Sequence, residues 1–231
     1  MRLPEPLRAL IFDVDGTLAE TELAHLAAFN AAFAAAGLDW RWSEAEYARL
    51  LTTTGGKERI ARHARELGAP LAPAAVAELH ADKTRRYATL VADGAVALRP
   101  GVAELLAAAR ARGVRLGVAT TTTPANVDAL VRATLGVPAG EVFEVIAAGD
   151  AVEAKKPAPD VYLLALAGLG LGPAGCVAVE DSRNGLVAAR AAGLFTVVSP
   201  SRFAAGEDLA AADLLLPSLA GLLAEPALSP P

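Results

Sequence analysis

Cysteine is nearly absent from this sequence. The chain of 231 residues contains a single cysteine, Cys176, which excludes an internal disulfide and any metal site built from several thiolates. Because Cys176 lies in the apolar segment GCVAVED, we expect it to be a buried core residue. The lack of disulfides suits a reducing compartment, so we expect the protein to be cytoplasmic.

Long apolar segments and an excess of positive charge are lacking as well. Hydrophobic residues make up 54% of the chain, but charges interrupt every apolar stretch before it reaches the roughly 20 residues of a membrane-spanning helix. The segment MRLPEPLRALIFDVDGT has two prolines and lacks the apolar region of a signal peptide. The net charge of −5 disfavours nucleic acids and anionic membranes as partners. We expect a soluble monomer with no nucleic-acid or membrane partner.

Short apolar segments alternate with helical segments over most of the chain. The apolar segments are continuous, which is typical of parallel strands buried on both faces. Two alanine-rich helical segments end at Gly37 and Gly113, and glycine commonly stops a helix. This alternation predicts an α/β fold with a doubly wound parallel sheet. The expected strands are residues 8–15, 114–120, 144–150, 176–181, 195–200 and 213–217.

Residues 20–93 differ from the rest of the chain. They show helical pattern without a convincing strand, and they separate the first two strands by far more residues than one crossover helix requires. We interpret them as an all-helical cap domain inserted into the sheet domain. The expected division is a core formed by residues 1–19 and 94–231, and a cap formed by residues 20–93.

Polar residues occur at the carboxyl ends of four expected strands. In chain order they are Asp13 and Asp15, then Thr120, then Lys156, and then Glu180 and Asp181. In an open parallel sheet the carboxyl ends of the strands meet at one crevice. We therefore expect these residues to form a single site although they are far apart in the sequence.

Several carboxylates at one buried crevice require a compensating cation. Burying carboxylates side by side is costly unless positive charge neutralises them. A hard divalent ion with oxygen ligands fits, and Mg²⁺ binds through one or two carboxylates together with a substrate phosphate. We expect Mg²⁺ as the cofactor, held by Asp13 and Asp181, with Asp15 and Glu180 as further candidate ligands.

The same residues can carry out phosphoryl transfer. With a metal and Lys156 keeping its carboxylate ionised, Asp13 can attack phosphorus and form an aspartyl phosphate. Asp15 can protonate the leaving oxygen and then take a proton from the hydrolytic water. Thr120 and the neighbouring residues Thr121 and Thr122 can hold the oxygens of the transferred group.

Each cluster taken alone also has a plain structural interpretation. Residues 13–17 could form a turn that caps the next helix, and residues 120–123 could cap another. Lys156 could be a solvated surface residue, and Glu180 with Asp181 could begin a helix. The presence of all four clusters in order, each at the end of a strand, favours the shared site.

Four motifs resemble those of the haloacid dehalogenase superfamily. They are DVDGT at 13–17, the strand-end Thr120, KKPAPD at 155–160 and VEDS at 179–182. The resemblance implies a Rossmann-like core, an inserted helical cap, Mg²⁺ dependence, and Asp13 as nucleophile with Asp15 as general acid and base. It also implies that Asp181 and the backbone carbonyl of Asp15 bind the metal.

A narrower resemblance is to the CbbY-type sugar phosphatases. It is carried by the stretches AETELAHLAAFN, LLTTTGGKERIARH, KTRRY, VIAAGD and EDSRNGL. This resemblance implies a phosphatase that acts on a small phosphorylated sugar. The substrate that it favours is xylulose-1,5-bisphosphate of the Calvin cycle.

A substrate with a second phosphate needs cations remote from the metal, and the cap supplies candidates. Lys83 and Arg86 lie one helical turn apart, so we expect them to face the same anion. Lys57 follows Gly55 and Gly56 at an expected helix start, where free backbone amides also bind phosphate.

Other charged cap residues are assigned to the hinge or to the surface. Glu20 and His25 follow the first motif, and we expect them to reach sugar hydroxyls or the leaving group. Arg59 is a further cap cation. We expect Arg62 and Arg85 to be solvated surface residues.

Other functions share parts of this pattern. A mutase of the β-phosphoglucomutase type shares His25 and Lys83 in position but differs around TTTGGKER, and a phosphatase for another phosphosugar or for phosphoglycolate would share the core motifs. A true dehalogenase needs neither magnesium nor a carboxylate at Asp15. A signalling receiver also phosphorylates an aspartate near threonine and lysine, but it has no large cap.

Overall fold

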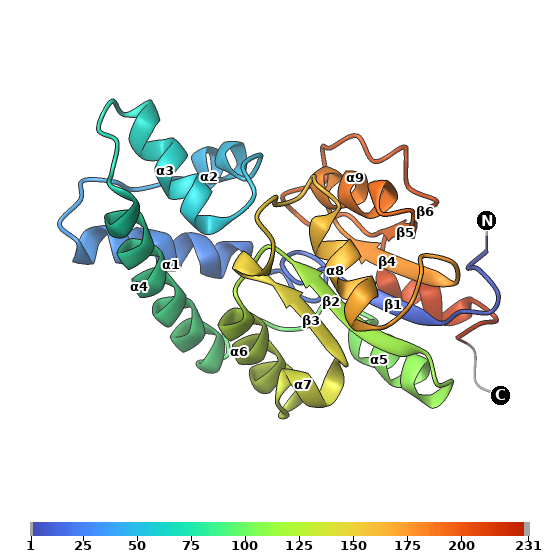
Figure 1. The fold of residues 1–231 in the computed structure, drawn as a ribbon. Coiled ribbons are helices and arrows are strands. Elements are labelled where there is room, and N and C mark those ends of the chain that lie inside the picture. The colour runs from blue at the N-terminus through green and yellow to red at the C-terminus, as the bar shows by residue number, and fades with distance from the viewer. Residues whose placement is uncertain (1, 229–231) are drawn as a thin grey trace.

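A parallel β-sheet forms the centre of the molecule (Figure 1). The computed structural model describes residues 2–228, and within them the strands follow the order β3-β2-β1-β4-β5-β6, with every neighbouring pair parallel. All six predicted strands are present. Each is shorter than predicted, by one to four residues. The strands are β1 (Ala9–Phe12), β2 (Arg115–Thr120), β3 (Val145–Ala148), β4 (Cys176–Glu180), β5 (Phe195–Val198) and β6 (Leu214–Leu215).

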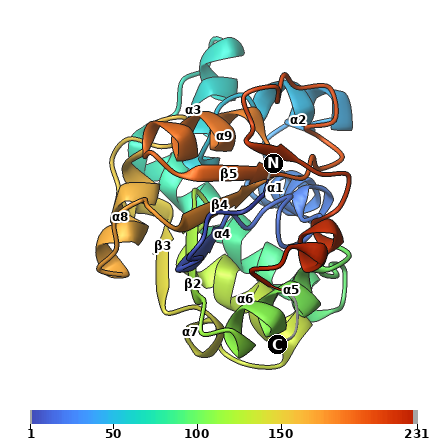
Figure 2. The same cartoon turned by 90° about the vertical axis from the view of Figure 1, so that its right-hand side faces the viewer.

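Helices cover both faces of the sheet, as the continuous apolar strands predict. In β1, Leu10 and Phe12 pack into one core with α5 and α6, whereas Ala9 and Ile11 pack into a second core with α8 and α9. Figure 2 shows these two helical layers on opposite sides of the strands. The doubly wound fold is therefore confirmed. The helices of this part are α5 (Val102–Ala111), α6 (Pro124–Leu135), α7 (Ala139–Val142), α8 (Asp160–Gly168) and α9 (Arg183–Ala191), with 3-10 turns η1 (Gly149–Ala151) and η2 (Leu219–Ala224).

Four further helices lie beside the sheet and bury a core of their own. An aromatic cluster that includes Phe29, Phe33, Trp42 and Tyr47 fills the space between them. The amide side chain of Asn30 fastens this cluster, because it accepts a hydrogen bond from Trp42 N at 2.8 Å and donates one to Trp42 O at 2.9 Å. Ala24 and Ala28 of α1 and Tyr87 and Val91 of α4 pack into the core of the sheet instead, and the division into a cap and a sheet domain stays a proposal. The cap helices are α1 (Glu22–Ala35), α2 (Glu44–Leu50), α3 (Gly56–Glu66) and α4 (Pro73–Ala92).

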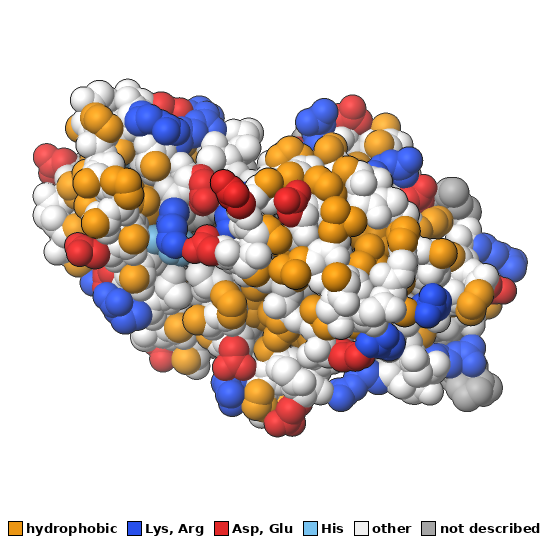
Figure 3. Space-filling view, in the orientation of Figure 1, with side chains coloured by type: hydrophobic (Ala, Val, Ile, Leu, Met, Phe, Trp, Pro, Cys, Tyr) orange, Lys and Arg blue, Asp and Glu red, His pale blue; other side chains and the backbone are white. Residues whose placement is uncertain are grey.

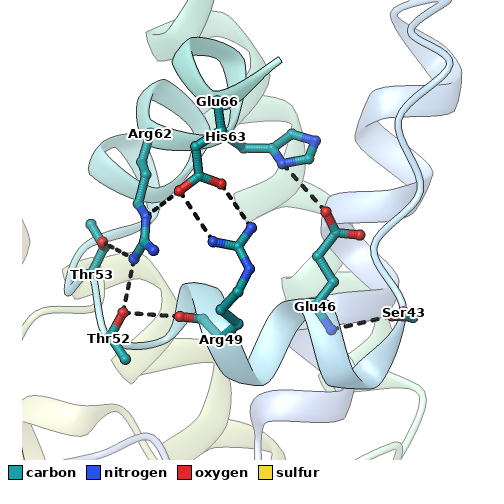
Figure 4. A network of polar contacts seen from close by, with 8 residues as sticks. All are labelled: Ser43, Glu46, Arg49, Thr52, Thr53, Arg62, His63 and Glu66. Atoms are coloured by element: carbon teal, nitrogen blue, oxygen red, sulfur yellow. Dashed lines mark hydrogen bonds and ion pairs between the residues drawn. The ribbon is translucent and has the colours of Figure 1, made fainter.

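A polar network on the surface links α2 to α3 (Figure 4). The carboxylate of Glu66 accepts hydrogen bonds from Arg49 and from Arg62, and Arg62 also donates to the hydroxyls of Thr52 and Thr53. Surface ion pairs of this kind contribute little stability individually. The network orients the α2–α3 connection, and it leaves the Arg62 side chain half-buried, 28% exposed.

The cap joins the sheet domain through two chain segments that pair with each other. Ala19 and Leu98 form an antiparallel bridge, and Arg99 N donates to Leu18 O at 2.8 Å. The two crossings therefore lie side by side at the end of β1, next to Asp13 and Asp15. In residues 2–228, every helix is either too short or too polar to cross a lipid bilayer.

We predict that Gly101→Ala destabilises the protein more than Gly113→Ala. Both glycines have positive φ, +87° and +68°, so either substitution strains the backbone by about 1 to 2 kcal/mol. A Cβ at Gly101 would also lie 2.4 Å from Cα and N of Ala220, whereas a Cβ at Gly113 meets nothing within 4 Å. Overpacking adds about 1 to 3 kcal/mol at Gly101. Urea unfolding midpoints check this, and equal losses would contradict the close packing of η2 on α5.

Candidate active site

Three carboxylates gather at the carboxyl ends of β1 and β4. Asp13 follows β1, Glu180 ends β4 and Asp181 follows it, and the two strands are neighbours in the sheet. One oxygen from each carboxylate lies within 4.8 Å of the other two, and all three residues are buried. The parallel register therefore brings together residues that are more than 160 positions apart in the sequence.

Lys156 lies against this cluster. Its Nζ donates to Asp13 Oδ1 and to Glu180 Oε1, both at 2.6 Å, and the Tyr162 hydroxyl donates to the same Glu180 oxygen at 2.6 Å. Burial alone would lower the pKa of Lys156, but the two carboxylates outweigh it and raise the pKa above its usual value. Lys156 is therefore a buried partner of the two carboxylates and not a surface residue.

The cluster carries more negative than positive charge. Burial raises the pKa of Asp13 to about 7, with Glu180 and Asp15 adding to the rise against the opposing effect of Lys156. Burial, together with the charges of Asp13 and Glu180, also raises the pKa of Asp181 well above its usual value. Three buried carboxylates facing one ammonium group form a hard oxygen donor set that fits a divalent cation such as Mg²⁺.

Threonines after β2 form the adjoining wall. Thr120 is buried, and its Oγ1 accepts a hydrogen bond from Thr122 N at 3.2 Å. Thr121 and Thr122 line the same cavity as Asp13. The helix cap is formed by a different residue, because Thr123 Oγ1 accepts from Asn126 N at 3.2 Å. The hydroxyl and amide groups at 120–122 can therefore face the cavity.

Asp15 turns away from the three carboxylates. Its Oδ1 accepts hydrogen bonds from Thr21 Oγ1 at 2.6 Å and from His25 Nε2 at 2.8 Å. His25 Nδ1 lies 2.6 Å from Lys83 Nζ, and because an ionised carboxylate can only accept, His25 Nε2 donates to Asp15. Burial would raise the pKa of Asp15, but His25 and Thr21 outweigh it and lower the pKa below its usual value.

The cap supplies the opposite wall of the cavity. Gly55 and Gly56 begin α3, and the buried cations Arg59 and Lys83 line the cavity beside them. The guanidinium of Arg59 lies 5.1 Å from the centre of the Tyr47 ring, and its NH1 donates to the Tyr47 hydroxyl at 3.0 Å. Burial lowers the pKa of Lys83 to about 7. Figure 3 shows the surface notched between the part that carries α2 and α3 and the part that carries α9.

Three predicted binding residues lie outside the cavity. Glu20 is exposed and accepts from Arg202 N, and Lys57 donates to Asp150 Oδ2 at 2.6 Å. The structure does not bring Arg86 together with Lys83 in the cavity. Arg86 Nε donates to Asp82 Oδ2 at 2.6 Å, and Arg86 lines a separate groove between α1 and α4 with Arg85. Lys83 and Arg86 are one helical turn apart, but Asp82, one turn before Arg86, binds its guanidinium and holds it on another side of α4.

Sequence reasoning also missed part of the cavity wall. Arg59 was only one of several cap cations, and its burial beneath aromatic rings distinguishes it from the others. The loop after β5 carries no motif that would have identified it. The further cavity residues that were missed are Glu22, Phe29, Thr54, His80, Asn184, Ser201, Phe203 and Glu207.

Known proteins resemble this chain over most of its length. A family model described as haloacid dehalogenase-like hydrolase matches residues 7–193. The CbbY protein of Rhodobacter capsulatus is 62% identical over 213 residues, which cover 92% of this chain and 94% of that protein.

Two crystal structures of CbbY from Rhodobacter sphaeroides have the same fold. One, in complex with phosphate, is 56% identical with a TM-score of 0.91, covering 94% of this chain and 96% of that chain. The other is a mutant in complex with xylulose-1,5-bisphosphate, and it is 54% identical with a TM-score of 0.92, covering 97% of this chain and 100% of that chain. The chain therefore belongs to the haloacid dehalogenase-like hydrolases, and within them it is a phosphatase of the CbbY type.

Proposed function

We propose that this phosphatase is Mg²⁺-dependent and hydrolyses a small sugar bisphosphate, xylulose-1,5-bisphosphate, through an aspartyl phosphate. One observation carries the proposal. The cavity has a carboxylate cluster with Asp13 and Lys156 on the sheet side, and the buried cations Arg59 and Lys83 on the cap side. The solved relative that binds xylulose-1,5-bisphosphate shares the fold and more than half of the sequence.

Asp13 is the nucleophile in this mechanism. A carboxylate oxygen of Asp13 attacks phosphorus, and the bond from phosphorus to the sugar oxygen breaks. Bound Mg²⁺, held by Asp13 and Asp181, would supply the positive charge that keeps both carboxylates ionised and draws in the phosphate. Lys156 holds Asp13 in place, and the Thr120 hydroxyl and the Thr121 amide donate to the phosphoryl oxygens. Glu180 accepts hydrogen bonds from Lys156 and Tyr162, so it fixes the position of the ammonium group that contacts Asp13.

Asp15 is the general acid and base. In the first half of the reaction it gives a proton to the sugar oxygen as that oxygen leaves. In the second half it takes a proton from the water that attacks the aspartyl phosphate, which releases inorganic phosphate and restores Asp13. The hydrogen bonds from Thr21 and His25 hold Asp15 beside the cavity and favour the ionised form that this second step requires.

The second phosphate of the substrate binds in the cap. Arg59 and Lys83, both on cap helices, provide positive charge in the cavity that Asp13 also lines. The backbone amides at the start of α3, after Gly55, have no partner within the helix. A helix N-terminus of this kind favours a bound anion. A substrate that carries two phosphates therefore meets cationic groups at both ends, whereas a monophosphate leaves the cap cations unused.

A phosphate-release screen tests the proposed substrate. We expect the highest kcat/KM for xylulose-1,5-bisphosphate, lower values for hexose phosphates and phosphoglycolate, and loss of all activity on chelation of Mg²⁺. Asp13→Asn should abolish phosphate release from every substrate because the amide is a poor nucleophile. Near-normal turnover by Asp13→Asn, or full activity in excess chelator, would refute the proposed mechanism.

Asp15→Asn should lower kcat by about 10²- to 10⁴-fold because it removes the proton donor and acceptor. Calorimetric titration with the substrate should show that binding is retained, since the amide keeps the shape of the side chain. Asp39→Asn, at an exposed cap position, is the matched control and should not change kcat. An unchanged kcat for Asp15→Asn would remove this residue from proton transfer.

Lys83→Met should reduce kcat/KM for the bisphosphate far more than for a small alkyl monophosphate such as glycerol 3-phosphate, whose leaving group also needs a proton. Loss of a charge-assisted hydrogen bond of about 1.5 to 3 kcal/mol corresponds to about a 10- to 100-fold change in the ratio of the two values. Because Lys83 also contacts His25, the ratio isolates binding of the second phosphate from any effect on proton transfer. Arg86→Met on the same helix is the control and should leave the ratio unchanged. Equal losses on both substrates would place Lys83 outside the phosphate site.

A further inference from the structure

Arg99 uses its whole guanidinium group to join three separate segments next to the active site. Its NH1 donates to Gly16 O and to Ser199 O, the latter at 2.8 Å. Its NH2 donates to Ser199 Oγ at 3.0 Å and to Pro200 O at 2.9 Å, and its Nε lies 3.5 Å from Glu20 Oε1. The side chain is only 10% exposed. The three segments are the turn after β1, the loop after β5 and the first crossing into the cap.

The residues that follow these carbonyls hold Asp181. Thr17, directly after Gly16, donates its hydroxyl to Asp181 Oδ1 at 3.4 Å. Ser201, directly after Pro200, lies beside Asp181 at Gly16, and its side chain acts to lower the pKa of the Asp181 carboxyl. Arg99 thus donates to the carbonyl of the residue directly before each of the two side chains that orient Asp181.

The space around Asp181 leaves little freedom for these segments to shift. A Cβ on Gly16 would lie 2.3 Å from Asp181 Oδ2 and 3.0 Å from Ser201 Cβ. The turn after β1 therefore packs directly between Asp181 and the loop after β5. A small displacement of either segment would change the direction in which the carboxylate points.

We propose that Arg99 is a positioning residue that sets the Mg²⁺ affinity of the site by holding Asp181 through Thr17 and Ser201. This inference rests on the proposed function, since it takes Asp181 as a metal ligand. A lysine cannot replace the arginine, because its single nitrogen cannot reach carbonyls in two segments with the fixed spacing of a planar guanidinium. Residues that orient metal ligands change metal affinity by about 10- to 100-fold when they are mutated.

The test measures Mg²⁺ binding to the protein without substrate by isothermal titration calorimetry. Arg99→Lys and Arg99→Met should each weaken Mg²⁺ binding by about 10- to 100-fold, and guanidinium chloride at millimolar concentration should restore part of the affinity of Arg99→Met. Arg110→Met is the matched control, because Arg110 also donates to a backbone carbonyl, Glu141 O, but away from the site. It should bind Mg²⁺ like the unmodified protein.

A double-mutant cycle distinguishes positioning from general destabilisation. If Arg99 acts through Ser201, the losses of Mg²⁺ affinity in Arg99→Lys and Ser201→Ala should not add in the double variant. Unchanged affinity in a folded Arg99→Lys protein, or additive losses, would overturn the proposal. Should Arg99→Met fail to fold, Arg99→Lys and Ser201→Ala still give the answer.

The failure of the proposed function would look different. If the unmodified protein does not bind Mg²⁺, or if Asp181→Asn binds Mg²⁺ as tightly as the unmodified protein, the proposed metal site is wrong and the role of Arg99 fails with it. If Asp181→Asn weakens binding and Arg99→Lys does not, the metal site stands and the positioning role fails.

Discussion

A buried ammonium group between two carboxylates is the interaction on which the active site depends. Lys156 joins Asp13, at the end of β1, to Glu180, at the end of β4. Taking carboxylates out of water is costly unless a counter-charge and hydrogen bonds accompany them. Because Lys156 lies beyond β3, two strands away from β1 in the sheet, the ion pairs also tie the loop after β3 to the centre of the sheet.

The cavity has an excess of carboxylates on the sheet side and cationic side chains on the cap side. On the sheet side, burial raises the pKa values of Asp13 and Asp181, and the neighbouring carboxylates add to the rise. On the cap side, Arg59 and Lys83 are buried against aromatic rings. A divalent cation would neutralise the carboxylates of the sheet side, and a phosphate would neutralise the cations of the cap side. Arg99 connects the hinge of the cap to the loops that hold Asp181, so the two halves of the site share one support.

Local pattern and position in the chain predicted the sheet side of the site well. Six continuous apolar segments became six parallel strands, and the polar residues that follow them converged, because the carboxyl ends of parallel strands share one edge. The cap was harder to predict. Lys57, Arg59, Lys83 and Arg86 look alike as charges in a helical pattern, yet only Arg59 and Lys83 line the cavity. Asp150 and Asp82 hold the other two elsewhere.

The sequence by itself determined the doubly wound sheet, the position of the helical insertion and the residues at the strand ends, because these follow from local periodicity and chain order. Only the tertiary structure decided which cap cations face the cavity, that Asp15 bonds to His25, and that Arg99 joins three segments. Those outcomes depend on partners far away in the chain, whose competition for each side chain is settled by packing in three dimensions.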